Sequence, residues 1–144
     1  MTFQSEVLLN TQVNSNCYYM ELYAPGAVAK ALPGQFFHVQ VHEGLSPLLR
    51  RPLSIHYMNK EKGVLGFLFQ VKGKGTELLS KKIPGDRVDM LGPLGKGFNT
   101  NPDGENILII GGGIGIAPLY PLAQELRRLQ KNVTVLIGAR NKEM

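Results

Sequence analysis

Hydrophobic residues alternate with other residues along the first hundred positions, in short segments separated by turns. Val39 and Val41 follow this period of two, as do Phe67, Phe69 and Val71, and such a period is typical of strands with one buried face. Pro-Gly pairs and single glycines separate the segments. The pattern predicts six strands, over residues 3–13, 17–23, 36–42, 52–57, 64–71 and 86–91. Six short strands at this spacing favour a six-stranded antiparallel, Greek-key-like β barrel, with a sandwich as the alternative.

The pattern changes after the polar, turn-rich residues 99–104. Residues 107–110 form a continuous apolar run of the kind that is buried on both faces of a parallel sheet. A helical repeat of apolar residues and a second apolar run at 133–137 follow; the repeat consists of Leu119, Leu122, Ala123, Leu126 and Leu129. This order predicts parallel strands joined by a right-handed crossover, as at the start of an α/β nucleotide-binding domain. We therefore expect two domains, over 1–100 and 104–144.

Composition and charge fit a globular protein. Of the 144 residues, 43% are hydrophobic and 19% charged, and the formal net charge is +5. The Lys and Arg residues form no run of five or six, so the charge alone gives little support for nucleic-acid binding. A non-catalytic barrel that binds RNA is the remote alternative, but it does not explain the glycines that precede the predicted helix.

Cys17 is the single cysteine, which excludes an internal disulfide and any metal or iron–sulfur site made only of cysteines within this chain. It falls in a predicted strand, where we expect a packed, unreactive thiol. The first residues lack the apolar core of a signal peptide, and no apolar run approaches the roughly 18 residues of a membrane span. These features predict a cytoplasmic protein.

The tetrapeptide Arg51-Pro52-Leu53-Ser54 combines a guanidinium, a proline and a hydroxyl. An arginine binds phosphate through two hydrogen bonds, and the serine can contact another part of the same ligand. Proline lacks a backbone donor, so we expect this strand at a sheet edge or barrel mouth, within reach of a ligand. An ordinary edge strand with a solvated arginine is the alternative.

Two glycine-containing loops precede predicted helices. Residues 73–80 place glycines and Thr76, as N-cap, before a short helix whose free N–H groups attract a phosphate; a capped connector is the alternative. Residues 111–118 lie where nucleotide-binding folds hold a pyrophosphate. The sixth position counted from Gly111 is Ile116 rather than glycine, and no acidic residue ends the second strand. Tight packing of helix against strand without a ligand is the alternative for this loop.

Six motifs occur in one order: Pro-Gly-Gln-Phe at 33–36, Arg-Pro-Leu-Ser at 51–54, Gly-Lys-Gly-Thr at 73–76, Gly-Asp at 85–86, Gly-Pro-Leu-Gly at 92–95 and Gly-Gly-Gly-Ile-Gly-Ile-Ala-Pro at 111–118. On these motifs the chain resembles the ferredoxin–NADP reductase superfamily, in which a flavin-binding barrel precedes a pyridine-nucleotide domain. Within it, the chain most resembles the electron-transfer subunits of the NAD-dependent (B-type) dihydroorotate dehydrogenases. The resemblance implies an FAD-binding barrel over 1–100 and a partial NAD-binding domain over 104–144.

The resemblance also implies which residues bind the cofactors. Arg51, followed by Pro52, binds the FAD pyrophosphate, while Leu53 covers the flavin ring and Ser54 bonds near its reactive edge. The other positions are Leu68, Phe69 and Gln70 along the flavin, Gly75 and Thr76 at the pyrophosphate, and Gly112, Gly113 and Gly115 where NADH approaches. The family often has a basic residue where this chain has Gln70.

The reaction that the resemblance implies is electron transfer from NADH to FAD, then through a [2Fe–2S] cluster to the catalytic dihydroorotate dehydrogenase subunit of a heterotetramer, in pyrimidine biosynthesis. This chain needs no catalytic side chain and no metal ligand for that role. In the family, the nucleotide domain continues and ends in the cysteines of the cluster, whereas this sequence ends at Met144. We therefore expect a C-terminally truncated chain whose barrel folds and can bind FAD, but which binds NADH poorly and holds no cluster.

The motifs leave two questions open. The partner is one, because a subunit of another NAD(P)H-dependent flavin reductase, of ferredoxin reductase or sulfhydrogenase type, carries the same motifs. The nucleotide is the other, because Arg140 suits the 2′-phosphate of NADP but equally suits a solvated strand end. For His56, which follows the arginine motif, we expect a structural role.

Overall fold

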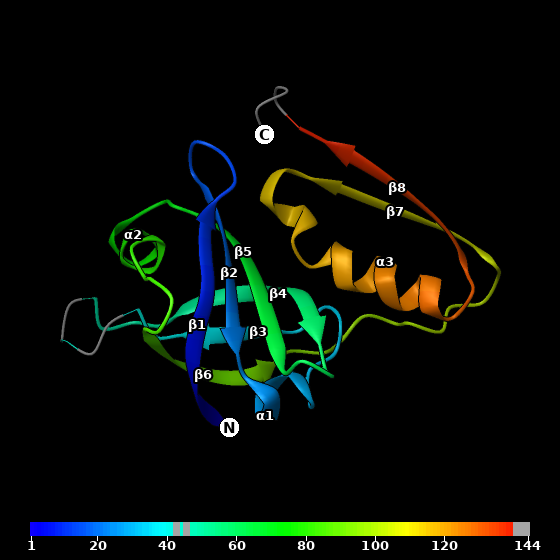
Figure 1. Ribbon diagram of the computed structural model, residues 1–144. Coiled ribbons are helices and arrows are strands. Elements are labelled where there is room, and N and C mark those ends of the chain that lie inside the picture. Colours follow the sequence, from blue (N-terminus) through cyan, green and yellow to red (C-terminus); the bar gives the residue numbers. More distant parts are fainter. Residues whose placement is uncertain (42–43, 45–46, 140–144) are drawn as a thin grey trace.

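The computed structural model describes residues 1–41, 44 and 47–139, and its N-terminal part is a closed six-stranded barrel (Figure 1). The strands are β1 (Thr2–Gln12), β2 (Cys17–Tyr23), β3 (Phe36–Val39), β4 (Arg51–Asn59), β5 (Val64–Gln70) and β6 (Arg87–Leu94). They are antiparallel neighbours in the order β1-β2-β5-β4-β3-β6, a Greek-key order because β2 lies beside β5. The predicted fold class is confirmed. His42, at the end of the predicted third strand, lies outside the described residues.

Alternate side chains of the strands fill the barrel, as the period of two predicts. Phe37 and Phe67 are fully buried and meet edge to face, with ring centroids 6.0 Å apart. The short helix α1 (Pro25–Val28) adds the buried Ala27 and Val28 to this core. Burial of each large apolar side chain contributes about 1.5–3 kcal/mol, so the core holds the six strands together. Cys17 is also buried, as expected.

The closed barrel gives β4 no free edge, so of the two places predicted for this strand the sheet edge is wrong, whereas the start of β4 does line an opening that a ligand can reach. Pairing of β4 with β5 nevertheless begins only at Ile55, opposite Phe67. The N–H of Ile55 donates to Gln35 beside β3, and N–H directions alternate along a strand, so the nitrogen of Pro52 faces β5. No pairing has begun there. The missing donor therefore costs no ladder hydrogen bond and marks the point where β4 and β5 separate.

Helix α2 (Lys74–Ser80) follows β5 and is fixed at both ends. Its N-cap is Gly73, not Thr76 as predicted. The Thr76 hydroxyl lies in the first turn, where it accepts from the N–H of Lys72 at 3.0 Å and donates to the Gly73 carbonyl at 3.0 Å. At the other end, the Asn10 amide of β1 donates to the carbonyls of Leu79, Ser80 and Lys82 at 2.9, 3.2 and 2.8 Å. These bonds satisfy carbonyls that a helix end leaves without partners.

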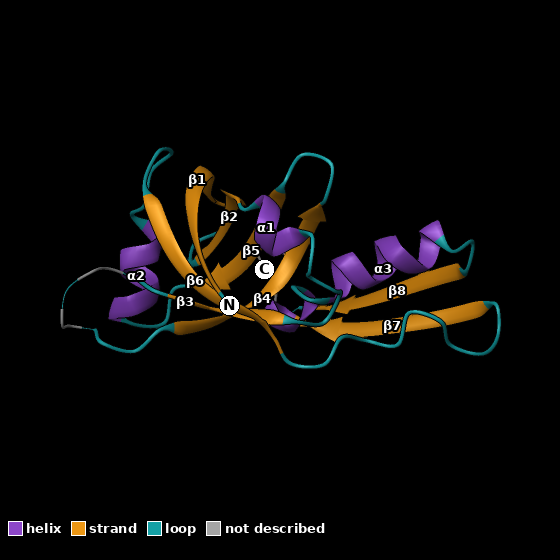
Figure 2. Cartoon of the chain, turned by 90° about the horizontal axis from the view of Figure 1, so that it is seen from below, coloured by secondary structure: helices purple, strands orange, loops and turns teal. Residues whose placement is uncertain are grey.

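A second unit follows β6 and lies beside the barrel (Figures 1 and 2). It consists of β7 (Asn106–Gly112), the 3-10 helix η1 (Gly113–Ile116), α3 (Leu119–Arg128) and β8 (Asn132–Gly138). The two strands are parallel, as predicted, and α3 contacts both of them and β4. Burial of β7 on both faces, however, was a wrong prediction for the described residues. Ile109 is 5% exposed, whereas Leu108 and Ile110, which point to the opposite face, are 57% and 68% exposed.

Candidate functional site

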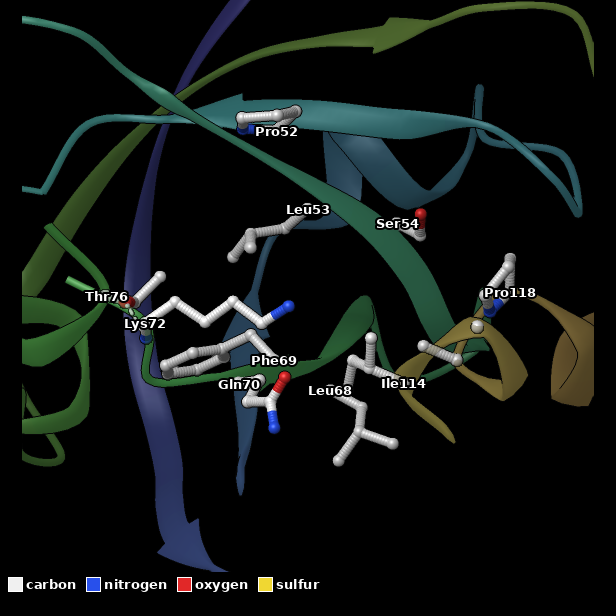
Figure 3. Close-up of a pocket in the computed structure, with 12 residues that line it drawn as sticks. Pro52, Leu53, Ser54, Leu68, Phe69, Gln70, Lys72, Thr76, Ile114 and Pro118 are labelled. Atoms are coloured by element: carbon white, nitrogen blue, oxygen red, sulfur yellow. Dashed lines mark hydrogen bonds between the residues drawn. The ribbon is translucent and has the colours of Figure 1, made fainter. Parts of the chain in front are cut away.

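A cavity of about 390 Å³ opens where β4 and β5 separate (Figure 3). The start of β4 forms one wall, the end of β5 and the loop into α2 form another, and η1 with the residues after it forms a third. The lining residues are Pro52, Leu53, Ser54, Leu68, Phe69, Gln70, Lys72, Thr76, Ile114, Gly115, Ala117 and Pro118. The structure therefore brings most of the predicted cofactor-binding residues together around one opening.

The cavity combines apolar surface with a few polar groups. Leu53 and Phe69 are 7% and 2% exposed, and Tyr18 stacks on Phe69 with ring centroids 6.0 Å apart. Ser54 and Gln70, both half-buried, bring a hydroxyl from β4 and an amide from β5 (Figure 3). Such a lining suits a flat, largely apolar ring system that also carries hydrogen-bonding atoms.

The guanidinium of Arg51 lies against Gly75 in the first turn of α2. A Cβ atom at Gly75 would be 2.3 Å from Nε and 2.8 Å from Cζ of Arg51, so the arrangement requires glycine. Nη1 of Arg51 donates to the Leu49 carbonyl at 2.9 Å, while Nε and Nη2 have no partner among the described residues. The arginine and the helix start, two separate predictions from the sequence, thus form one anion-attracting surface.

The neighbouring Arg50 is committed to the fold instead. It forms a salt bridge with Asp89 of β6 and donates to the Asp89 carbonyl at 3.1 Å and to Oε1 of Gln40 at 3.2 Å. The two charged side chains are 27% and 19% exposed, so solvent screens their attraction only in part. Of the two adjacent arginines, Arg51 is the one left for a ligand.

A second hollow, of about 630 Å³, adjoins the cavity. It is lined by Asn16, Gln70, Lys72, Gly112, Gly113, Gly138 and Ala139, and two of these, Gln70 and Lys72, line the cavity as well. Gly112 and Gly138 are paired at the carboxyl ends of β7 and β8. In α/β folds, ligands bind at this end of parallel strands.

The glycines of residues 111–115 occur for different structural reasons. A Cβ atom at Gly111 would be 2.4 Å from the Leu119 side chain, so tight helix packing explains this glycine. Gly113 has a φ of 53°, in the left-handed region that favours glycine. At Gly112 the nearest atom to a Cβ would be 3.6 Å away, and at Gly115 nothing lies within 4 Å. Packing therefore does not explain Gly112 and Gly115, which leave backbone open to a ligand.

His56 joins the barrel to the second unit. Its Nδ1–H donates to the Ala117 carbonyl at 2.8 Å, and its ring centroid lies 5.3 Å from that of Tyr120 and 5.7 Å from that of Tyr19. The Tyr19 hydroxyl in turn donates to Glu21 at 2.7 Å. Burial, and then this hydrogen bond, raise the pKa of Tyr19 above its ordinary value. These contacts hold the cavity-lining Ala117 against β4.

Among the described lining residues that the sequence did not predict, Lys72 is the one with a charged side chain. Its side chain extends across the cavity beside Phe69 (Figure 3). The available signal was the period of two, because Leu68, Gln70 and Lys72 follow it along the end of β5 and into the next loop. Arg140, the candidate contact for a 2′-phosphate, lies outside the described residues.

Within residues 1–41, 44 and 47–139, no group of three or more His, Cys, Asp or Glu side chains could hold a metal ion. In the same part of the chain, no helix is long and apolar enough to cross a membrane.

No family model matches the chain, but curated relatives do, and they share the name "Dihydroorotate dehydrogenase B (NAD(+)), electron transfer subunit". The one from Desulforamulus reducens is 52% identical over 140 residues, 97% of this chain and 53% of the relative. The one from Geobacillus thermodenitrificans is 49% identical over 74% of this chain and 42% of the relative. The one from Bacillus mycoides is 38% identical over 100% of this chain and 57% of the relative. The chain spans about half the length of the curated relatives it matches.

Three solved structures that share the fold are an oxidoreductase and two reductases by name. The NADH-dependent reduced ferredoxin–NADP oxidoreductase superposes with a TM-score of 0.86 and 33% identity, over 96% of this chain and 49% of that chain. The ferredoxin reductase in carbazole 1,9a-dioxygenase superposes with a TM-score of 0.81 and 25% identity, over 99% of this chain and 44% of that chain. Phthalate dioxygenase reductase superposes with a TM-score of 0.78 over 99% of this chain and 45% of that chain. At 20% identity, this match supports the fold alone.

Proposed function

This chain belongs to the family of dihydroorotate dehydrogenase B electron transfer subunits, within the ferredoxin reductase-like superfamily, and from that premise we propose that it is the FAD-binding part of such a subunit. Its proposed activity is that of an oxidoreductase subunit, which passes electrons between NADH and, through FAD, a partner that oxidises dihydroorotate. The proposal divides the chain into an FAD-binding barrel, 1–100, and a partial NAD-binding domain, 104–144. A cytoplasmic location, which the sequence predicts, is part of it.

The observation that carries the proposal is the meeting of three features at one cavity. These are the gap between β4 and β5, the unpaired edge of the Arg51 guanidinium, and the first turn of α2 at Gly75. FAD combines a flat ring system with a pyrophosphate, so it needs an apolar slot and an anion-binding end within the reach of one ligand. The close approach of Arg51 to Gly75, which a Cβ atom would prevent, fits that need.

Each residue of the cavity has a proposed role. Arg51 and the backbone N–H groups of Gly75 and Thr76 would hold the pyrophosphate, because the first N–H groups of a helix have no partner within it. Leu53 would cover the flavin ring, with Pro52 beside it, and Ser54 would bond at the ring edge. Leu68, Phe69 and Gln70 would form the opposite wall. When bound, FAD accepts a hydride from NADH and releases electrons singly; the residues around it exclude water and fix the ring.

NADH would enter the second hollow. Gly112 and Gly113 line this hollow and Gly115 lines the adjoining cavity. NADH would approach the protein backbone closely at these three positions, since they carry no side chain to block it. The hollow and the cavity share Gln70, so the two bound molecules would meet beside this residue. Electron transfer needs such a meeting, because hydride passes only between atoms held at close range.

The [2Fe–2S] cluster of the family does not fit this chain. Cys17 is its single cysteine and is 6% exposed in the barrel, whereas such clusters are held by several thiolates. We assign the chain no step through the cluster. The relatives' name, electron transfer subunit, supports a catalytic partner, and we propose the dihydroorotate-oxidising subunit of a heterotetramer; co-purification after co-expression tests this.

The visible absorption spectrum of the purified chain, after FAD is added and unbound FAD is removed, tests the proposal. We expect retained flavin bands in the wild-type chain and at least about tenfold weaker FAD binding in Arg51→Ala, because a charge-assisted pair is lost. Arg127→Ala, in the exposed last turn of α3, is the matched control and should bind as the wild type does. A folded wild-type chain that stays colourless with FAD supplied would refute the proposal.

A further inference from the structure

Lys72 lies at the boundary of the two hollows and lines both of them. Its side chain is exposed and extends toward the cavity from the loop between β5 and α2 (Figure 3). None of the described residues forms a salt bridge or hydrogen bond with its ammonium group. Among the described residues that line the second hollow, Lys72 alone carries a charge. An unpaired cation in a concave site attracts an anionic ligand.

The rest of the second hollow is mainly backbone. Gly112 and Gly138 lack side chains at the ends of β7 and β8, and a Cβ atom at Gly112 would meet nothing closer than 3.6 Å. Asn16 is held in place at another wall, because its N–H donates to Oδ1 of Asn14 at 3.1 Å and its carbonyl accepts from Val71 at 2.7 Å. Open backbone beside one cation and one amide is a suitable setting for a phosphate group.

Resting on the proposed function, we propose that Lys72 binds the pyrophosphate of NADH from the barrel side. Two dinucleotides would meet at this site, and each carries a pyrophosphate. Arg51 and the first turn of α2 already serve that of FAD, whereas no other charged residue among those described lines the hollow for NADH. Lys72 would thus set the affinity for NADH as a contact residue, without moving a proton or an electron.

The rate at which NADH bleaches the flavin of the FAD-loaded chain tests this assignment. At low NADH concentration the bleaching rate is proportional to the NADH concentration, so the bimolecular rate constant can be measured without saturating the NADH site. We expect Lys72→Gln to lower it about tenfold, the loss of one charge-assisted contact, and Lys72→Arg to retain most of it. Added salt should slow the wild type and have little effect on Lys72→Gln, because salt screens the attraction between charges. Lys62→Gln, exposed in the turn at the opposite end of β4, is the control and should react as the wild type does.

A second readout requires no flavin. In a fluorescence titration of the FAD-free chain with NADH, Lys72→Gln should bind about tenfold more weakly than the wild type. Equal NADH binding and equal bleaching in the two proteins, with FAD retained, would overturn the assignment and leave the proposed function standing. Loss of FAD from Lys72→Gln with unchanged NADH binding would place the cation at the other pyrophosphate and also overturn it. A flavin that dithionite bleaches but NADH does not would remove NADH as the donor and overturn the assignment of Lys72, while the retained flavin would leave the FAD-binding part of the proposed function standing.

Discussion

Replacing Gly75 by alanine should weaken FAD binding without weakening the fold. A Cβ atom at this position would lie 2.3 Å from Nε and 2.8 Å from Nη2 of Arg51, so the guanidinium would have to retreat by about 1 Å or more to reach van der Waals distance. The methyl group itself is tolerated by the backbone, because Gly75 is in a helix and its φ is not positive. The substitution therefore acts on the position of Arg51.

The two effects of Gly75→Ala have opposite signs. Alanine in place of glycine within a helix stabilises the folded chain by about 0.5–1 kcal/mol. Displacement of Arg51 would cost a charge-assisted contact to the pyrophosphate, about 1.5–3 kcal/mol, which corresponds to roughly a ten- to hundredfold weaker FAD affinity. A variant that melts at or above the wild-type temperature but binds FAD poorly would separate binding from folding.

Flavin fluorescence titrations of four proteins measure the coupling: the wild type, Gly75→Ala, Arg51→Ala and the double variant. If Gly75 acts through Arg51, the double variant should bind FAD no more weakly than Arg51→Ala, because neighbouring residues with one shared role are not additive. Thermal melts without FAD give the stability of each. Wild-type FAD affinity in Gly75→Ala, together with an unchanged or higher melting temperature, would refute the placement of the pyrophosphate at Arg51.

Three further predictions concern residues that hold the site in place. Asn10→Asp replaces the donor to three carbonyls at the end of α2 with a negative charge, so denaturant titration should show a loss of about 2–3 kcal/mol. His56→Phe loses the bond to Ala117 and should cost about 1–2 kcal/mol, more than His56→Asn, which keeps a donor; equal losses would argue against that bond. Burial and Glu21 raise the pKa of Tyr19, so above pH ~10 the folded chain holds a proton that the unfolded chain releases. The free energy of unfolding should then fall by at most about 1.4 kcal/mol per pH unit, less for a half-exposed side chain, and Tyr19→Phe should remove this slope.

The barrel could be predicted from the sequence because its signal is local. Val39, Phe67 and Phe69 alternate with other residues and are buried in the core, and the run at 107–110 does form a strand parallel to the one at 133–137. The sequence left two places open where a local pattern has two structural outcomes, a sheet edge or a barrel mouth. Pro52 indicated a missing donor, but a proline needs only an unpaired side, and the gap between β4 and β5 supplies that within a closed barrel.

The residues that line the cavity were predicted only in part. Short motifs can be recognised in the sequence, whereas the contacts between motifs that lie far apart along the chain cannot. The sequence places Arg51 and Gly75 apart, and only the folded chain shows that one requires the absence of a side chain at the other. Thr76 was predicted as an N-cap, yet its hydroxyl bonds back from the first turn to Lys72 and Gly73. Lys72 belongs to no motif, so its place at both hollows follows only from how the barrel and the second unit pack.

The affinity of the cavity for FAD should depend on residues that never touch it. Arg50 is held by Asp89, which leaves Arg51 free at the start of β4, and Asn10 holds the far end of the helix whose first turn carries Gly75. A site fixed before the ligand arrives loses less conformational freedom on binding. Since a ligand that binds only the folded state also stabilises it, FAD should raise the melting temperature of the wild type, and less so that of Asn10→Asp. An equal rise in both proteins at one FAD concentration would mean that the helix keeps its position without this anchor.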